Sequence, residues 1–349
     1  MKLSSLLGKK ESIKIGNLAP LSGDYSYYGE WEKEGIDLAL EEINKRGGIN
    51  GQKVLVVRED DGADADKSMM ALSKLIFADK VQAVIGPISS DILLADTPIA
   101  QKNKVVLISA IAGAKIAAGD YTFRTYPSNR QQGELLAASA LQAGYKSAAI
   151  IYINNGYGLD LAKAVRSTAS QSGLDISIVE GYRADSIDFK DQLARIREKN
   201  PEVIFLLSYP KDLGIILKQA YELAIPAKFM APDTFIDPGI IGAGKITEDI
   251  IYVMPEESFS DDFVKKFKKK FGKTPNVFNA MNYDCMNLLA LAIDRGGNNG
   301  PAIKEELLKI KDYEGATGSI TFDEYGNAIN RPLQVKTVRE GKSAPYPGE

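Results

Sequence analysis

Residues 13–61 of the chain read IKIGNLAPLSGDYSYYGEWEKEGIDLALEEINKRGGINGQKVLVVREDD, and this stretch decides the fold. Its first apolar residues predict a β-strand that ends at the turn-forming Pro20-Leu21-Ser22-Gly23. A long amphipathic helix follows and stops at Gly47-Gly48. A second strand, at residues 54–57, runs into Asp60-Asp61. Strand, helix and strand in this order predict a βαβ unit.

The loop between the first strand and the helix is rich in tyrosine, with Tyr25, Tyr27 and Tyr28. Dinucleotide-binding βαβ units carry glycines at this point, because the backbone must approach a phosphate closely. Aromatic and hydroxyl groups in their place favour a site for a small polar organic ligand over a nucleotide site.

The composition is that of an ordinary globular protein. A length of 349 residues is enough for roughly two domains of about 150 residues each. The net charge of −3 gives no reason to expect nucleic acid or a membrane surface as a partner. No apolar run approaches the roughly 20 residues that span a bilayer. Residues 1–10 lack the apolar core of an intact signal peptide, so either a signal segment is missing from this chain or the protein is cytoplasmic.

The chain contains no histidine and a single cysteine, Cys285. Without histidine, Ser-His-Asp and Cys-His nucleophile systems and His-containing zinc sites are excluded. Cys285 forms no intrachain disulfide, and its apolar helical surroundings predict a buried thiol that acts as a small hydrophobe. An enzyme that uses carboxylate, Tyr, Lys or Ser stays open, but the composition favours binding without chemistry. No metal and no cofactor is expected.

Strand and helix signals alternate along most of the chain, which predicts parallel sheets with right-handed crossovers. Two such series in succession indicate an α/β fold of two Rossmann-like lobes, each with a parallel central sheet. We expect residues 12–126 and 256–329 in lobe 1, and residues 127–254 and 331–349 in lobe 2. The chain then crosses between the lobes three times, and such a three-segment hinge allows closure on a ligand.

The pattern changes after residue 256. Three predicted helices are followed by hairpin-like strands at residues 318–322 and 333–338, on either side of the turn Tyr325-Gly326-Asn327. The simplest arrangement returns the helices to lobe 1 and the last strand to lobe 2.

Ligands of open α/β sheets bind outside the carboxyl ends of the strands. The loops at these ends carry hydroxyl groups, aromatic rings and a single carboxylate. In lobe 1 they offer Ser22, Tyr25, Tyr27, Tyr28, Ser89, Ser90, Ser109 and exposed amides around residues 111–113, and in lobe 2 they offer Tyr157, Tyr209 and Asp233.

Each of these residues also has a purely structural alternative. Ser90 begins a helix, where a hydroxyl and free amides form a natural carboxylate receptor, but the sequence by itself favours Ser89 or Ser90 as a helix N-cap. Asp233 either caps the next turn or pairs with a ligand ammonium. The tyrosines are either ligand contacts or half-buried aromatics. Asp60-Asp61 is weak evidence for a cation site and is more typical of a strand end that caps the next helix.

Several segments, in order along nearly the whole chain, match one known family: GNLAPLSGDYSYYGE, ALEEINKRGGINGQKVLVVREDDGAD, VIGPISS, VVLIS, FRTYPSN, NNGYGLDLA, DFKDQLARIREKNPEVIFLLSYPKDLG, KFMAPD and ATGSITFDEYGN. The chain resembles the type I periplasmic solute-binding proteins of the branched-chain amino-acid transport family, which serve ABC importers. The resemblance implies two lobes that close around a small-molecule ligand without chemistry. It also implies a periplasmic or lipid-anchored extracytoplasmic location, a membrane permease as partner, and a monomer.

The resemblance implies roles for individual residues. Ser90 and the loop from Ile111 to Gly113 match groups that hold a ligand α-carboxylate. Tyr157 and Tyr209 match tyrosines of lobe 2 that meet the ligand, and Asp233 falls where an acidic residue pairs with the α-ammonium. The expected ligand-binding set is Tyr28, which matches an aromatic lining the side-chain pocket, with Ser89, Ser90, Ile111, Gly113, Tyr157, Tyr209 and Asp233.

The loop after Ser109 departs from the family pattern. Amino-acid binders commonly carry a Ser-Pro-x-Ala-Thr pattern there, whereas this chain has Ser109-Ala110-Ile111-Ala112-Gly113-Ala114. Gly113 stands where the hydroxyl is expected, so one carboxylate donor is lost. We expect an amino acid, branched-chain or other, as ligand. The alternative is an aromatic carboxylate, an amide or urea bound by a binding protein or sensor on the same fold.

Overall fold

The computed structural model describes residues 11–114 and 121–347, and the chain divides into two compact units. Of the described residues, unit 1 contains 11–112, 121–126 and 257–331, and unit 2 contains 113–114, 127–256 and 332–347. The expectation about a signal segment at residues 1–10 lies outside the described residues. None of the described helices combines the length and the apolar character needed to cross a bilayer.

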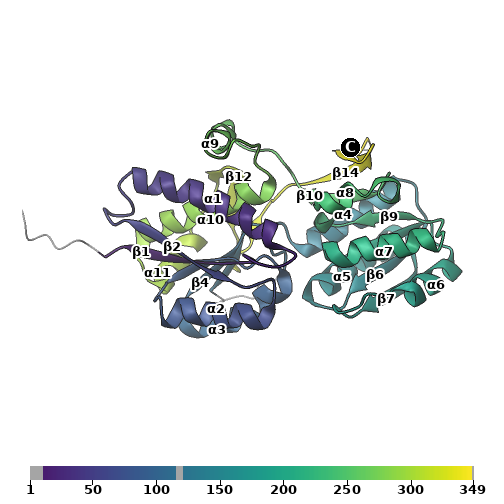
Figure 1. The fold of residues 1–349 in the computed structure, drawn as a ribbon, viewed down its shortest axis with the longest axis horizontal. Coiled ribbons are helices and arrows are strands. Elements are labelled where there is room, and N and C mark those ends of the chain that lie inside the picture. Colours follow the sequence, from purple (N-terminus) through teal and green to yellow (C-terminus); the bar gives the residue numbers. More distant parts are fainter. Residues whose placement is uncertain (1–10, 115–120, 348–349) are drawn as a thin grey trace, which may run out of the picture. The chain divides into compact units, whose positions relative to one another are not determined.

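A five-stranded parallel sheet forms the centre of unit 1 (Figure 1). The strands lie in the order β2-β1-β3-β4-β5, so the order reverses between β1 and β3. Their bounds are β1 (Ile13–Ala19), β2 (Val54–Asp60), β3 (Ala83–Ile85), β4 (Val106–Ser109) and β5 (Thr122–Arg124).

Helices cover both faces of this sheet. Right-handed crossovers place α1 on one face, and α2 and α3 on the other, because the chain moves in opposite directions along the sheet on the two sides of β1. Helix α10 packs against α1, on the face opposite to α2 and α3 (Figure 1). The helices are α1 (Ser26–Lys45), α2 (Ala65–Phe77), α3 (Ser90–Asn103), α9 (Asp261–Phe271), α10 (Val277–Gly296) and α11 (Gly300–Leu308).

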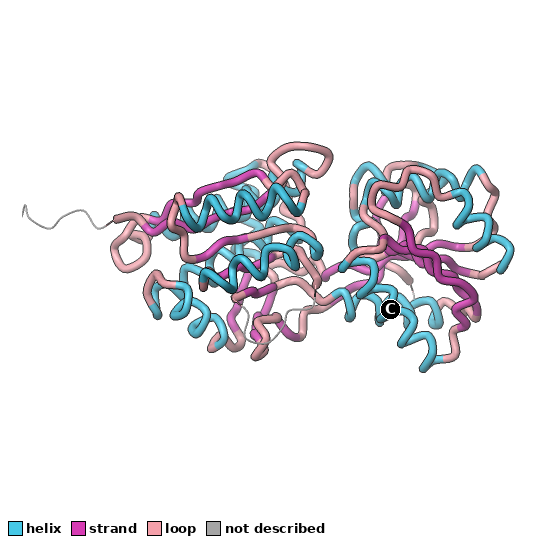
Figure 2. The backbone as a smooth tube through the Cα atoms, turned by 90° about the horizontal axis from the view of Figure 1, so that it is seen from below, coloured by secondary structure: helices cyan, strands magenta, loops and turns pink. Residues whose placement is uncertain are grey.

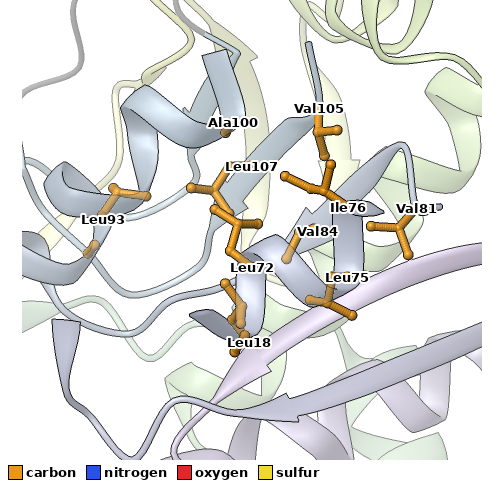
Figure 3. Packing of buried hydrophobic residues seen from close by; sticks show 12 residues of the cluster. Leu18, Leu72, Leu75, Ile76, Val81, Val84, Leu93, Ala100, Val105 and Leu107 are labelled. Atoms are coloured by element: carbon orange, nitrogen blue, oxygen red, sulfur yellow. The ribbon is translucent and has the colours of Figure 1, made fainter. Parts of the chain in front are cut away.

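An apolar core fills the space between the sheet of unit 1 and helices α2 and α3 (Figure 3). Leu18, Val84 and Leu107 come from β1, β3 and β4, and Leu72 and Leu75 come from α2; all five are buried. Burial of such a side chain contributes about 1.5–3 kcal/mol. The core therefore fixes the carboxyl ends of β1, β3 and β4, where the predicted site loops begin.

Unit 2 is built on a seven-stranded sheet in the order β15-β14-β10-β9-β8-β6-β7. The strands from β10 to β7 are parallel, whereas β14 and β15 run antiparallel to their neighbours. The order reverses between β6 and β8. The bounds are β6 (Ser147–Ile153), β7 (Asp175–Tyr182), β8 (Val203–Leu207), β9 (Lys228–Ala231), β10 (Ile251–Pro255), β14 (Leu333–Arg339) and β15 (Lys342–Pro345).

Figure 2 shows the strands of this second sheet as a layer with helices on both sides. Helices α4 and α5 pack against each other on one face, and the right-handed crossover rule places α6 and α7 on the other. The helical elements are α4 (Asn129–Gln142), α5 (Gly156–Ser172), α6 (Lys190–Lys199), α7 (Pro210–Glu222), α8 (Pro238–Ile241) and the short 3₁₀ turns η1 (Asp233–Ile236) and η2 (Gly244–Ile246).

The predicted α/β class with parallel central sheets is confirmed, and so is the burial of Cys285. The end of the chain corrects the prediction, because the strands at residues 318–322 and 333–338 are not hairpin partners. β12 (Gly318–Phe322) pairs with β11 (Tyr313–Gly315) and β13 (Ala328–Ile329), whereas β14 pairs with β10 and β15. The turn at Tyr325-Gly326-Asn327 reverses the chain into the two-residue β13, which is too short to give a strand signal of its own.

Candidate functional site

Each unit has one point at which its strand order reverses, and open α/β sheets bind ligands at the carboxyl ends of the strands beside such a point. In unit 1 this point lies between β1 and β3, whose following loops lead to Tyr28 and to Ser89 and Ser90. In unit 2 it lies between β6 and β8, which lead to Tyr157 and Tyr209. The sheet topology therefore places these predicted site residues at the reversal points.

In unit 2 the structure brings three predicted site residues together. The rings of Tyr157 and Tyr209 are stacked, with centroids 5.0 Å apart and planes inclined by 10°. The Tyr157 hydroxyl donates a 2.8 Å hydrogen bond to Oδ1 of Asp233. Tyr157 is 4% exposed and Asp233 is 6% exposed, so the pair lies in a largely water-free environment.

Asp233 does not act as a helix cap, which removes its structural alternative. It is the first residue of η1, the capping position belongs to Pro232, and no side-chain capping bond forms there. A buried carboxylate needs hydrogen-bond donors or a cation. Besides Tyr157, the side chain of Gln132 supplies a donor, because its Nε2 donates to Oδ2 of Asp233 over 3.3 Å.

Gln132 is not among the site residues predicted from the sequence. It lies in the first turn of α4 rather than in a strand-to-helix loop, and it is completely buried. A glutamine in a helix gives no signal of its own, since its burial depends on which element the helix packs against.

Tyr157 acts as a neutral donor. Burial raises the pKa of its hydroxyl well above the usual value, and the nearby Asp233 carboxylate raises that pKa further. A phenolate beside the carboxylate would place two negative charges in a buried space, so the phenol stays protonated.

In unit 1, Ser89 and Ser90 lie at the start of α3. Ser89 has the extended backbone of an N-cap, but its side chain makes no capping bond. Its Oγ is buried and has no hydrogen-bond partner among the residues that the structure describes. The hydroxyl of Ser89 is therefore not the predicted cap, and it lies beside a helix N-terminus that favours an anion. Ser90 begins the helix and is 1% exposed.

The loop after β4 corrects one expectation. The Oγ of Ser109 accepts hydrogen bonds from the amides of Ile111 (3.3 Å) and Ala112 (2.9 Å), and it donates to the Pro87 carbonyl oxygen over 2.7 Å. The amides of Ile111 and Ala112 are therefore engaged within the loop, and the prediction that they are exposed is wrong. The Ser109 hydroxyl competes for these amides because it lies only two and three residues before them.

The space beside Gly113 is occupied by Asn129. A Cβ on Gly113 would lie 2.1 Å from Oδ1 of Asn129 and 3.0 Å from its backbone nitrogen. The Asn129 amide also donates a 2.9 Å hydrogen bond to the Gly113 carbonyl oxygen. The threonine or serine of the family pattern therefore does not fit here without movement, and the side chain of Asn129 takes its place.

Tyr28 lies in an aromatic cluster of unit 1. Its ring meets Trp31 (5.2 Å between centroids) and Phe278 (5.2 Å), both edge to face. Trp31 and Phe278 are stacked, and Tyr126 stacks on the same Phe278 at 6.4 Å. Edge-to-face and stacked pairs of this kind are worth about 0.5–1.5 kcal/mol beyond their buried area. The contribution of Phe278 was not predicted, because it comes from a helix 250 residues further along the chain.

Asp60 organises the loop after β1 rather than capping α2. Its carboxylate accepts bonds from the Leu21 amide (2.8 Å) and the Ser22 hydroxyl (2.5 Å), whereas Asp64 caps α2. Burial acts to raise the pKa of Asp60, but these bonds and one from Gly62 outweigh it and lower that pKa. Among the described residues, no group of acidic or cysteine side chains is arranged to hold a metal ion.

A two-unit α/β chain with polar and aromatic groups at the reversal points of its sheets is a typical ligand-binding scaffold. The model of the periplasmic binding protein family matches residues 12–343, so the chain belongs to this family. Its members are substrate-binding proteins of ABC transporters and not enzymes.

Individual relatives agree with this assignment. The leucine-, isoleucine-, valine-, threonine- and alanine-binding protein of Pseudomonas aeruginosa is 28% identical over 336 residues, which cover 93% of this chain and 89% of that protein. The substrate-binding protein LivJ of Streptococcus pneumoniae, solved in complex with isoleucine, is 28% identical with a TM-score of 0.83, covering 95% of this chain and 97% of that one. A solute-binding protein of R. palustris in complex with benzoate shares the fold, with 21% identity, a TM-score of 0.83 and coverages of 96% and 95%.

Proposed function

We propose that the chain is the extracytoplasmic solute-binding subunit of an ABC importer and that its ligand is an amino acid. The observation that carries the ligand class is the buried Asp233 carboxylate, which Tyr157 and Gln132 contact as neutral donors. A ligand ammonium brings a positive charge to this carboxylate, in a charge-assisted bond stronger than a neutral one.

The other end of an amino acid requires donors for a carboxylate. Ser89 and Ser90 at the start of α3 offer a hydroxyl and a helix N-terminus, which suit an anion. The proposed ligand-binding set is Tyr28, Ser89, Ser90 and Ile111 from unit 1, and Gly113, Tyr157, Tyr209 and Asp233 from unit 2.

An aromatic carboxylate is the second candidate ligand. The stacked rings of Tyr157 and Tyr209 and the missing hydroxyl at Gly113 favour it. Such a ligand has no ammonium, however, and it would bring a second negative charge towards the buried Asp233 carboxylate, which is unfavourable. The amino acid is therefore the better candidate.

A thermal-unfolding screen tests the ligand class. The panel contains leucine, isoleucine, valine, threonine and alanine, with benzoate, 4-hydroxybenzoate and small amides as the competing class. A ligand present at about 100 times its Kd should add roughly 2.7 kcal/mol to the free energy of unfolding. Stabilisation by an amino acid is expected, whereas stabilisation by the aromatic acids alone would contradict the proposal.

The proposed partner is the membrane permease of the importer, and the proposed state in solution is a monomer that binds no nucleic acid. Light scattering of the purified protein tests the monomer. Ligand uptake by vesicles that carry the permease, with and without this protein, tests the partner.

A further inference from the structure

We propose that Gln132 is a positioning residue of the binding site, which holds the Asp233 carboxylate in the orientation that receives a ligand ammonium. This inference rests on the proposed function, since it assumes that Asp233 meets the ammonium.

Gln132 contacts Asp233 twice. Its Nε2 donates to Oδ2 of the side chain, and its Oε1 accepts from the Asp233 backbone amide, each over 3.3 Å. The two bonds engage the side chain and the main chain of the same residue, so together they restrict rotation about the χ angles of Asp233. Each bond is at the long end of the normal range, so neither is strong by itself.

The two carboxylate oxygens of Asp233 accept from different side chains. Oδ1 accepts from the Tyr157 hydroxyl at 2.8 Å, and Oδ2 accepts from Gln132 at 3.3 Å. The two bonds together fix the direction in which the carboxylate points. Its orientation towards a ligand ammonium therefore depends on both side chains.

The two adjacent glutamines at the start of α4 have different roles. Ser128 and Gln131 form a capping box at the start of α4: the Ser128 Oγ accepts from the Gln131 amide at 3.1 Å, and the Gln131 Oε1 accepts from the Ser128 amide at 2.9 Å. The neighbouring side chain of Gln131 is thus used for the helix start, and Gln132 is completely buried.

The position of Gln132 is constrained by the neighbouring Gly133, which allows α4 to approach α5 closely. A Cβ at this position would lie 2.6 Å from the Cβ of Ala164 and 2.9 Å from the carbonyl oxygen of Leu161. Helix α5 also carries Tyr157 in its first turn. The close contact of the two helices therefore fixes the two donors of Asp233 relative to each other.

A double-mutant cycle with leucine, measured by calorimetry, tests the inference. Gln132→Met keeps the length of the side chain and removes both polar atoms, and we expect it to weaken leucine binding roughly tenfold. In an Asp233→Ala background the same substitution should have almost no further effect, because the group that Gln132 positions is gone. Gln132→Asn is the second variant if Gln132→Met does not fold; its amide is one methylene too short to reach both atoms, so the same pattern is expected.

Gln131→Ala is the matched control, since it removes the capping box one residue away. It should lower the unfolding temperature and leave the leucine Kd unchanged. Equal losses from the Gln132 substitution in both backgrounds, or an equal loss in the Gln131 control, would overturn the inference while leaving the proposed function intact. A wild-type protein that binds neither leucine nor any other amino acid of the panel contradicts the proposed function before any variant is made, and the inference falls with it.

Discussion

The Tyr157 hydroxyl donates a 2.8 Å hydrogen bond to the Asp233 carboxylate, and this bond connects the ends of two strands that are not neighbours. Strand β8 lies between β6 and β9, and Tyr209, which follows β8, stacks on Tyr157 at 5.0 Å. The loops after three adjacent parallel strands of one sheet thus bring an aromatic pair and a carboxylate together.

The first prediction concerns the hydroxyl of Tyr157. Tyr157→Phe keeps the stacked ring and removes one donor to Asp233, so we expect amino-acid affinity to fall by about 0.5–1.5 kcal/mol in binding free energy. Calorimetric titration measures the change. Tyr221→Phe is the control, because Tyr221 is 62% exposed on α7 and contacts none of these groups in the described structure. An unchanged Kd for Tyr157→Phe would mean that this bond does not matter for the ligand.

The second prediction concerns the space beside Gly113. Gly113→Ala should destabilise the protein by about 1–3 kcal/mol, because the new Cβ would lie 2.1 Å from the Asn129 Oδ1 in the present structure. Asn129→Ala in the same chain should restore part of the loss. Urea denaturation of the two single variants and of the double variant measures the change in the free energy of unfolding. Additive losses in the double variant would show that the two side chains do not compete for the same space.

The third prediction concerns Ser89, whose buried Oγ has no hydrogen-bond partner among the described residues. Ser89→Ala should leave the free energy of unfolding nearly unchanged, since no bond is lost, and it should weaken the binding of a carboxylate ligand. Ser128→Ala is the contrasting variant, because the Ser128 hydroxyl does cap its helix and its loss should destabilise by about 1 kcal/mol. If Ser89→Ala destabilised the protein as much as Ser128→Ala does and left the ligand Kd unchanged, Ser89 would have only a structural role.

The fourth prediction concerns pH, through a buried group of acids in unit 1. Burial raises the pKa of Asp96 to about 7 and that of Asp61 to about 6, and it raises the pKa of Glu32 well above its usual range. A raised pKa means that the folded state binds more protons than the unfolded state between about pH 4 and pH 7. The free energy of unfolding should therefore fall as the pH rises through this window.

Asp96→Asn isolates one of these acids. The variant keeps an acceptor for the Ser68 hydroxyl, which donates to Asp96 Oδ2 over 2.7 Å, but it cannot ionise. In the wild type the free energy of unfolding decreases between pH 4 and pH 8, and in Asp96→Asn this decrease should be smaller by about 1 kcal/mol or more. Each pKa unit corresponds to about 1.4 kcal/mol. Asp66→Asn, at an exposed aspartate of α2, is the control and should keep the wild-type pH profile. A profile of Asp96→Asn that matches the wild type would show that Asp96 is ionised in the folded protein.

The sequence predicts the architecture well where hydrophobic periodicity governs it. The apolar run at residues 203–207 predicts a strand with the bounds that β8 has, and the alternation of strands and helices predicts the parallel central strands of both sheets. For the first helix of unit 2, the apolar pattern of the sequence by itself predicts a start at Gln131, whereas the observed α4 starts two residues earlier, at Asn129. The capping-box pattern of Ser128 and Gln131 is a usable signal for the earlier start.

The polar contacts of the site are only partly predictable. Tyr157, Tyr209 and Asp233 follow strands, and strand ends in a parallel sheet converge, so their proximity follows from topology. Gln132 and Asn129 lie in a helix, and their roles depend on which loop the first helical turn packs against. No periodicity carries that information, because it is set by the close approach of α4 and α5 at Gly133.

The most direct test of the account is the affinity of the wild type and of Asp233→Ala for leucine, measured side by side by calorimetry. The account predicts that the wild type binds leucine and that the substitution weakens binding by about 2–5 kcal/mol, because the buried ammonium loses its partner. Equal affinity of the two proteins for leucine would contradict the role of Asp233 and with it the proposed mode of recognition.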